Sequence, residues 1–312
     1  VKRFWIKKYN IFSVVLSLLL IFTIHPTYAG EANQALNDIK NQAVQKAYYY
    51  GDSAIESWAR DNLSSLRLIE IETRSRADSK PTFRAITLFE LSGSQFKKLL
   101  SQISYSTYNN RETLNTGLIL RSMDSSMTHI FGLNIFYDHE FNTGHARTSL
   151  GFEMKSSVYD LNINLYEATS ELNHVDGAPE VAARGYDAEV GALLPYLPWA
   201  KLYYKRYQWN SVTKNIRHGE TVSLYMEPTS RLSIETGMQD DSTTNSHNAF
   251  IKLNYILCCN ERKVGPSIFT VSSNAYTFGK VNEERMYEKV RRENNIVSVR
   301  GGGGLTITAS GF

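Results

Sequence analysis

The sequence is poor in cysteine, with only 2 in 312 residues, Cys258 and Cys259, which are adjacent. The Cα atoms of neighbouring residues lie about 3.8 Å apart, closer than an ordinary disulfide requires. We therefore expect free thiols at a strand end, or one thiol that pairs between two chains of a dimer. A fold held together by a disulfide framework is excluded.

A strong excess of one charge is also missing, since the formal net charge is +3. That balance gives no reason to expect nucleic-acid binding. No glycine-rich phosphate loop follows a predicted strand. Three of the histidines, His174, His218 and His247, fall in separate predicted loops without the spacing of metal ligands. The sequence therefore predicts no metal and no other cofactor.

Long apolar runs are absent after the first thirty residues. The run from Ile11 to Ile24 has 14 residues, fewer than the roughly 20 that a membrane-spanning helix needs. Basic residues precede it, and the small-x-small triplet Thr27-Tyr28-Ala29 follows, as in an export signal. We predict a signal peptide over residues 1–29. Without a later helical span, the exported chain is a periplasmic or secreted protein or a closed β-barrel.

Alternation with a period of two runs along most of the remaining chain. In the stretch from Arg147 to Tyr166, apolar residues such as Leu150 and Phe152 alternate with polar or small ones. Successive side chains leave opposite faces of a strand, so this pattern indicates β-structure. Aromatic residues make up 12% of the chain, with 19 tyrosines, which is typical of a barrel with side chains at the membrane surface.

The pattern predicts twelve strands, an even number as in bacterial outer-membrane barrels. Long polar connections alternate with tight turns such as Ser156-Ser157, which predicts loops outside the cell and turns in the periplasm. The expected strands are 65–73, 82–91, 96–108, 112–121, 129–140, 145–155, 158–168, 182–193, 199–208, 220–227, 230–238 and 248–257.

The polar face of the predicted strands carries charges of both signs. A soluble β-sandwich or lipocalin would have to bury about ten such charges, at a cost of several kcal/mol for each unpaired one. A polar lumen accommodates them. The residues that we expect on the lumen wall include Glu153, Asp187, Glu189, Lys201, Lys205 and Arg231.

Helices are expected on both sides of the predicted barrel, residues 64–258. Residues 30–63 have apolar positions at helical spacing and predict a periplasmic helical segment. Residues 283–293 predict a mixed-charge helix, which suits a polar lumen or an exposed site beside the barrel. It lies in the segment 259–312, which is expected to form a pore helix, a Gly301–Gly304 hinge and a residual tail. The proposed lumen-helix residues are Glu288, Lys289, Arg291 and Arg292.

Asp138, His139, Glu140 and His145 cluster near one predicted rim and raise the alternative of a metal site or an acid–base pair. Because the strand period is two, Asp138 and His139 point to opposite faces. A structural role is therefore favoured over catalysis, and the chain is not predicted to be an enzyme.

Several segments, in order, resemble the intimin and invasin family, the inverse autotransporters. They include Phe131–Phe141, Gly144–Arg147, Leu194–Pro198, Lys201–Tyr207 and Tyr287–Val297. The resemblance implies a twelve-stranded barrel anchored in the outer membrane. It also implies a following chain that returns through the pore and carries an adhesive passenger of immunoglobulin-like domains to the cell surface. Here only 15 residues follow Val297, too few for one such domain, and no peptidoglycan-binding module precedes the barrel.

We therefore predict an all-β protein, a twelve-stranded antiparallel transmembrane β-barrel in the cell outer membrane. Its expected function is that of a translocator and anchor that exports its C-terminal segment. The alternatives are a passive pore and an outer-membrane hydrolase. Expected partners are outer-membrane lipid, the barrel-insertion machinery and periplasmic chaperones; nucleic acid is not a partner.

Overall fold

The computed structural model describes residues 57, 59, 61–76, 79–210, 216–242, 247–259 and 270–300. The chain divides into two compact units, Val1–Ser53 and Ala54–Phe312. The predicted signal peptide, nearly all of the predicted helix over 30–63 and the Gly301–Gly304 hinge lie outside the described residues. The described residues between 57 and 62 are helical. No helix among the residues described above has the length and apolar character to span a membrane.

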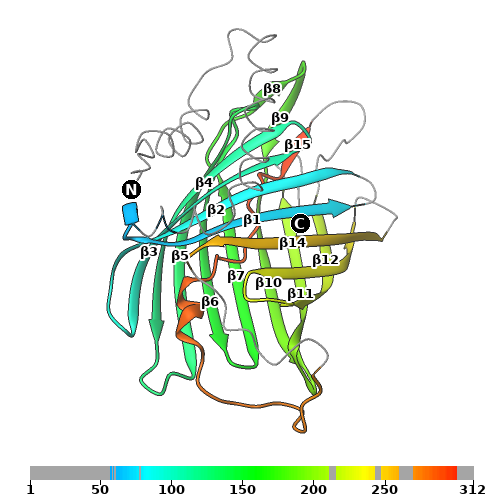
Figure 1. The fold of residues 1–312 in the computed structure, drawn as a ribbon. Helices are drawn as coiled ribbons and strands as arrows, with labels where there is room; N and C mark the ends of the chain where they lie inside the picture. Colours follow the sequence, from blue (N-terminus) through cyan, green and yellow to red (C-terminus); the bar gives the residue numbers. More distant parts are fainter. Residues whose placement is uncertain are drawn as a thin grey trace, which may run out of the picture. The chain divides into compact units, whose positions relative to one another are not determined.

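Twelve strands close into an antiparallel barrel (Figure 1), which confirms the predicted fold class. Each predicted strand range overlaps one observed strand of the barrel, because the period-two alternation marks the residues that enter the ladder. The barrel strands are β1 Leu66–Arg76, β2 Ser79–Gly93, β3 Lys97–Tyr108, β4 Arg111–Met123, β5 His129–Glu140, β6 Ala146–Ser156, β7 Tyr159–Ala168, β10 Arg184–Leu194, β11 Leu197–Asn210, β12 Ile216–Met226, β13 Leu232–Asp241 and β14 Asn248–Cys258.

Three further strands were not predicted. They are β8 Asn173–Val175, β9 Ala178–Ala182 and β15 Ser298–Arg300, and they form a small sheet in the order β15-β9-β8. Each is too short to show a clear period. The Asp176-Gly177 pair between β8 and β9 is the sequence signal that identifies this hairpin. Both residues have positive φ, 49° and 78°, as a two-residue hairpin turn requires.

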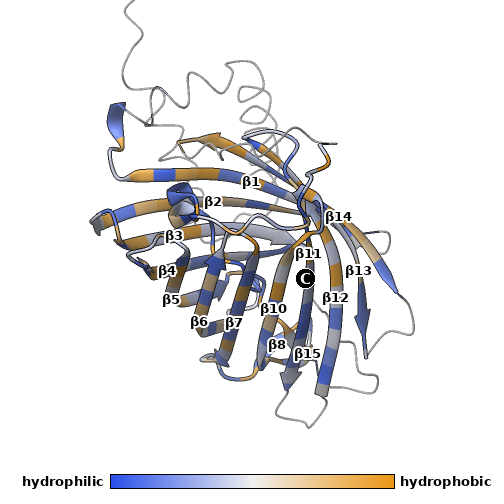
Figure 2. Ribbon diagram, turned by 90° about the horizontal axis from the view of Figure 1, so that it is seen from below, coloured by the Kyte–Doolittle hydropathy of each residue, from blue (hydrophilic) through white to orange (hydrophobic). Residues whose placement is uncertain are grey.

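Hydrophilic and hydrophobic residues alternate along the barrel strands (Figure 2), so the two faces of the barrel wall differ in polarity. Leu133, Ile135, Leu150 and Leu165 are each 55% exposed on the outer surface. The inward positions hold most of the buried polar residues. One part of the inner face is apolar, which the expectation of a polar lumen did not include; its residues are Leu68, Leu88, Leu100, Ile119, Phe136 and Ile256.

The two ends of the barrel carry connections of different length. We call the end with the connections 94–96, 124–128, 157–158, 195–196 and 227–231 the turn rim. The other end, the loop rim, carries the connections 77–78, 109–110, 141–145, 169–183, 211–215 and 242–247. The longest loop-rim connection, 169–183, contains the β8–β9 hairpin. The predicted arrangement of tight turns and long loops is present in part, because the loop-rim connections 77–78 and 109–110 are as short as turns.

Residues 281–300, which we call the linker, pass through the barrel from the turn rim to the loop rim (Figure 1). The amide of Val281 donates to the carbonyl of Met127 in a turn-rim connection, 2.6 Å away. A 3₁₀-helix, η1 Glu283–Tyr287, follows and is capped by the side chain of Asn282. The linker ends as β15, paired with β9 at the loop rim.

The helix predicted over residues 283–293 is wrong beyond Tyr287, because residues 288–297 are neither helix nor strand. The segment has little apolar surface with which to stabilise a helix. Its backbone and side chains bond instead to the wall at successive depths, which favours an open chain.

The expectation of free or intermolecular thiols is also not met. Cys258 and Cys259 form a disulfide between adjacent residues. Cys259 has φ of 84°, and this left-handed backbone turns the two side chains toward each other at the end of β14.

Candidate functional site

One side of the lumen, formed by β4 to β7, binds the backbone of the linker. Four wall side chains from these strands donate hydrogen bonds to linker carbonyl oxygens. The bonds are Asn115 Nδ2 to Asn294 (2.7 Å), Arg121 Nη1 to Met286 and Glu288 (2.6 Å each), Arg147 Nη2 to Glu293 (2.9 Å) and Asn164 Nδ2 to Arg291 (3.1 Å). These contacts satisfy backbone acceptors at the end of η1 and in the following segment, which has no secondary structure of its own.

Two linker amides are bound as well. The amide of Val290 donates to Gln102 Oε1 at 2.9 Å, and the amide of Glu293 donates to the hydroxyl of Tyr166 at 2.7 Å. The wall thus supplies both donors and acceptors, as a buried chain without a strand partner requires.

Asp138 of β5 is the most connected carboxylate on this side. It accepts two hydrogen bonds from Arg292 of the linker, at 3.0 and 2.6 Å, and two from Arg147, at 3.0 and 2.8 Å. Asn115 donates a further bond at 2.8 Å. The side chains of Asp138, Arg147 and Arg292 are fully buried. The guanidinium of Arg292 also lies over the ring of Phe136, 4.4 Å from its centroid.

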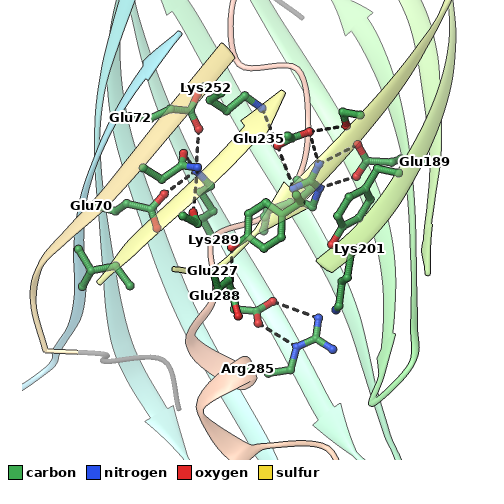
Figure 3. A pocket seen from close by; sticks show the side chains of 18 of the residues that line it. Glu70, Glu72, Glu189, Lys201, Glu227, Glu235, Lys252, Arg285, Glu288 and Lys289 are labelled. Atoms are coloured by element: carbon green, nitrogen blue, oxygen red, sulfur yellow. Dashed lines mark hydrogen bonds and ion pairs between the residues drawn. The ribbon is translucent and has the colours of Figure 1, made fainter. Parts of the chain in front are cut away.

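The opposite side of the lumen binds the linker through charged side chains (Figure 3). Arg291 contacts Glu189 of β10 at 2.5 and 3.1 Å and Glu235 of β13 at 3.1 Å, and lies 3.9 Å from the ring centroid of Tyr203. Arg291 therefore joins two strands that are not neighbours in the barrel.

Lys289 extends to the two strands that close the barrel. Its ammonium group lies 2.5 Å from Glu70 Oε1 and 2.6 Å from Glu72 Oε2, both on β1. It also lies 2.8 Å from Asn254 Oδ1 on β14. Three donors thus meet three acceptors, the full capacity of a lysine.

Near the turn rim, η1 and the residue after it are bound to β6 and β7. Arg285 contacts Asp160 at 2.8 Å and Glu288 at 2.8 Å. Lys155 contacts Glu288 at 3.0 Å. Lys201 of β11 contacts the same Asp160, also at 2.8 Å. The first linker residues are therefore held by alternating charges.

At the loop rim the linker leaves the barrel beside the β8–β9 hairpin. β15 pairs with β9 over three residues, from Ser298 with Ala182 to Arg300 with Glu180. Arg111 of β4 donates to both carboxylate oxygens of Glu180, at 2.6 and 2.9 Å, and to Ser298 Oγ at 3.2 Å. One arginine thus connects the barrel wall, the hairpin and the emerging strand.

The carboxyl group of Glu180 has an altered pKa. Burial alone would raise this pKa, but hydrogen bonds from His145, Arg111 and Ser298, with the positive charge of Arg111, outweigh burial and lower the pKa well below its usual range. The Glu180 carboxylate is therefore ionised while the sheet is intact.

A cavity of about 360 Å³ remains in the lumen between the linker and the side formed by β1 and β10 to β14. It is lined by Lys201 and by carboxylates that contact Lys289 and Arg291 (Figure 3). Lys205 lines it as well. The linker is thus packed closely against β4 to β7 and stands off from the opposite side.

A glycine makes room for the linker on the closely packed side. A Cβ atom at Gly117 would lie 2.4 Å from ring carbons of Phe136 on the neighbouring strand. The ring therefore lies flat over the glycine and leaves space above it for the Arg292 guanidinium.

The predicted wall residues differ in how closely they approach the linker. Glu189 contacts Arg291 directly. Glu153 binds Arg121, and Asp187 binds Asn164 and Tyr166, so both act through side chains that bind the linker backbone. Lys201 acts through Asp160, while Lys205 is the register partner of Glu189 and lines the cavity.

Arg231 is placed differently. It lies in the turn before β13, and its Nη1 is 3.4 Å from the carbonyl of Leu257 on β14. Its position follows the inward phase of Ser233 and Glu235, but it stands at the rim rather than beside the linker. All four predicted linker residues, Glu288, Lys289, Arg291 and Arg292, bind wall side chains.

Several wall residues that bind the linker were not among the predicted site residues: Glu70, Glu72, Gln102, Asn115, Arg121, Asp138, Arg147, Asn164, Tyr166, Glu235 and Asn254. Their inward phase was available from the alternation. The alternation does not predict the depth of each linker residue in the lumen. That depth determines which inward side chains contact the linker.

Of the residues considered for metal binding or acid–base chemistry, Asp138 and His139 face opposite sides of β5, while Glu140 and His145 belong to the loop-rim cluster around Arg111 and Glu180. Asp138 points into the lumen, and His139 packs edge-to-face with Phe141, ring centroids 5.1 Å apart. His145 contacts Glu180 at 3.2 Å as part of the loop-rim cluster. The described residues hold no group of three or more His, Cys, Asp or Glu side chains arranged for a metal ion.

The fold and site define a transmembrane β-barrel whose lumen is occupied by the chain that follows the last barrel strand. The family described as "Inverse autotransporter, beta-domain" matches residues 25–294. This chain belongs to that family, as its sequence resemblance indicated, and its location is the outer membrane.

The fold is also similar to solved structures. One, reported under "Unveiling the Mechanism Behind the in-meso Crystallization of Membrane Proteins", has a TM-score of 0.61 and 16% sequence identity, and the match covers 75% of this chain and 100% of the other. The KdgM porin has a TM-score of 0.41 at 7% identity, covering 60% and 97%. Outer membrane phospholipase A from Escherichia coli has 0.40 at 10% identity, covering 61% and 92%. The last two likenesses are too low to support an argument.

Proposed function

We propose that the barrel anchors the chain in the outer membrane and exports its C-terminal segment to the cell surface, without nucleotide, cofactor or enzymatic activity. The observation that carries this proposal is the path of the linker. It starts at a turn-rim connection, is bound along the lumen and ends as a strand of the loop-rim sheet.

The direction of export follows from the two rims. Outer-membrane barrels have short turns on the periplasmic side and longer loops outside. The loop rim carries the 169–183 connection, so it is assigned to the outside and the linker runs outward. The outer apolar surface is assigned to outer-membrane lipid, while the insertion machinery and periplasmic chaperones remain predicted partners.

The residues of the lumen have two roles in this proposal. Glu189 binds Arg291 of the linker directly. Lys201 binds Asp160, which in turn binds Arg285 of the linker. Glu153 and Asp187 orient the donors that bind the linker backbone. Lys205 is assigned to the same wall, and Arg231 to the rim rather than to the grip on the linker.

The test is protease shaving of intact cells that carry an epitope tag after Phe312. We expect cleavage of this tag from outside. A matched control carries the same tag inserted after Thr128, in a turn-rim connection, and this tag is expected to resist cleavage until the outer membrane is opened. Protection of the C-terminal tag in intact cells would contradict export.

A passive pore is the second candidate, because the cavity beside the linker leaves part of the lumen open. Conductance in a planar bilayer separates the two functions. A translocator with its linker in place is expected to conduct weakly, and deletion of residues 281–300 is expected to raise the conductance. A large conductance in the intact chain would favour the pore.

A further inference from the structure

The barrel closes where β1 meets β14, two strands at opposite ends of the barrel sequence. The ladder at this seam has a register shift between Ile69 and Glu70. A shift of this kind leaves a residue unpaired and locally weakens the ladder. The seam therefore needs support from side chains more than a regular strand pair does.

Two neighbouring inward residues of β1, beside this irregularity, are carboxylates. Glu70 and Glu72 are 2% and 4% exposed, so their charges are held away from bulk water. Like charges at this spacing and burial repel each other. Arg84 of β2 contacts Glu72 at 2.6 Å, on the side away from β14.

On the side toward β14, the cation that contacts both carboxylates comes from the linker, while Lys252 of β14 contacts Glu235 at 3.2 Å and acts on Glu72 through its charge. The Lys289 ammonium group contacts Glu70, Glu72 and Asn254, and Asn254 is the register partner of Glu72 across the seam. The same lysine thus lies over both seam strands (Figure 3). Asn254 is itself held by a 3.1 Å bond with Ser233 of β13.

The next linker residue adds an apolar contact at the same place. Val290 is 3% exposed and packs in the lumen cluster that contains Leu68 of β1 and Ile256 of β14. The charge of Lys289 and the side chain of Val290 therefore both bear on the seam, through different interactions.

We propose that Lys289 and Val290 latch the β1–β14 seam from inside the lumen, so that the barrel is fully closed only when the linker is seated. Removing the lysine leaves two buried carboxylates without this cation, and removing a partner from a buried ion pair is strongly destabilising. We expect opening to start at the seam, because its register shift lies directly beside Glu70 and Glu72; the register shifts of the β1–β2, β2–β3 and β10–β11 ladders lie elsewhere.

The test is hydrogen exchange of backbone amides in the purified full chain, held in detergent micelles. In Lys289→Met, exchange in β1 and β14 is expected to rise at least about tenfold, with a smaller change in β6 and β7. The matched control is Arg217→Met. Arg217 of β12 is 6% exposed and also binds a buried carboxylate, Asp241 of β13 at 2.5 Å, but this pair lies at the loop-rim ends of β12 and β13 and not on the seam strands. This control is expected to leave β1 and β14 unchanged.

A triple variant, Glu70→Gln with Glu72→Gln and Lys289→Met, removes the repulsion together with the cation. We expect it to exchange more slowly at the seam than Lys289→Met. If Lys289→Met does not fold, folding of the triple variant supports the latch, and failure of both overturns it. Unchanged seam exchange in Lys289→Met, an equal rise in all strands, or a triple variant no better than the single one also overturns it.

The latch does not depend on export. A fast-exchanging seam in Lys289→Met combined with a protected C-terminal tag would contradict the proposed function and leave the latch intact. A surface-exposed tag combined with an unchanged seam would do the reverse.

Discussion

The two sides of the lumen bind the linker in different ways. The side formed by β4 to β7 donates mainly to backbone carbonyls, through asparagine and arginine side chains. The side formed by β1 and β10 to β14 binds the charges of Lys289 and Arg291 across a cavity. A hydrogen bond to the backbone can form with whichever linker residue lies at a given depth in the lumen. A charge contact requires a particular side chain at that depth. The first side therefore provides a track for an extended chain, with its own charge contacts at Asp138, Lys155 and Asp160, and the second fixes the register of Lys289 and Arg291.

Asp138 connects the two modes, because it binds the linker side chain Arg292 and orients Arg147 and Asn115 toward the linker backbone. Asp138→Ala is expected to have the largest effect. It leaves two buried guanidinium groups without their carboxylate, at a cost of about 3–5 kcal/mol in the free energy of unfolding. Urea denaturation in micelles measures this loss.

The control for Asp138→Ala is Glu220→Ala. Glu220 faces Arg206 at 3.9 Å on the outer surface, with the two side chains 48% and 64% exposed. Exposed pairs of this kind contribute about 0–1 kcal/mol. Equal losses in the free energy of unfolding in the two variants would contradict the inference that buried Asp138 binds the linker.

Arg291→Met tests the register-setting side. Because Arg291 is 20% exposed beside the cavity, its loss is expected to cost less than that of Asp138, about 1–3 kcal/mol. The linker should keep its backbone bonds on the β4 to β7 side but shift more easily along the lumen. Amide hydrogen exchange in residues 288–297 as the urea concentration rises measures that release; Arg291→Lys, which keeps the charge, should lose protection at a higher urea concentration than Arg291→Met.

Gly117→Ala tests the closely packed side. The added methyl group displaces Phe136, and the expected cost is about 1–3 kcal/mol for overpacking. Gly279→Ala is the control, since a Cβ at Gly279 meets nothing within 4 Å. Thermal or urea midpoints compare the two; a Gly117→Ala protein as stable as Gly279→Ala would mean that the ring does not need the space.

The smallest expected effect is that of pH on the loop-rim sheet. The pKa of Glu180 is lowered in the folded chain, so its contribution to stability is complete above the ordinary value of about 4.3 and is lost as the pH falls below it. Amide exchange in β15, corrected for intrinsic rates, should therefore rise on acidification below that pH. Glu180→Gln should remove most of the pH dependence of exchange in β15. If exchange in this variant still depends on pH, another titrating group is responsible.

The barrel strands were predictable from the sequence because each one carries its own alternation, as in Leu150, Phe152 and Met154 of β6. The charged lumen wall followed from the same phase. The linker path was not predictable, since residues 288–297 have no period, and their partners are fixed by depth in the lumen. Nor did the pattern reveal that inward Leu68 and Ile256 would be covered by Val290. The Asp176-Gly177 turn was the one local signal of the exit sheet.

The central claim is that the linker lies threaded in the lumen at the register described. Ser106 Oγ of β3 lies 2.8 Å from Asn295 Oδ1 of the linker, so Ser106→Cys with Asn295→Cys, in a chain with serine at positions 258 and 259, tests it directly. Oxidation of intact cells should link these two positions and leave the shifted pair, Ser104→Cys with Asn295→Cys, mostly unlinked. No link in the first pair, or equal linking in both, would contradict a threaded linker at a fixed register.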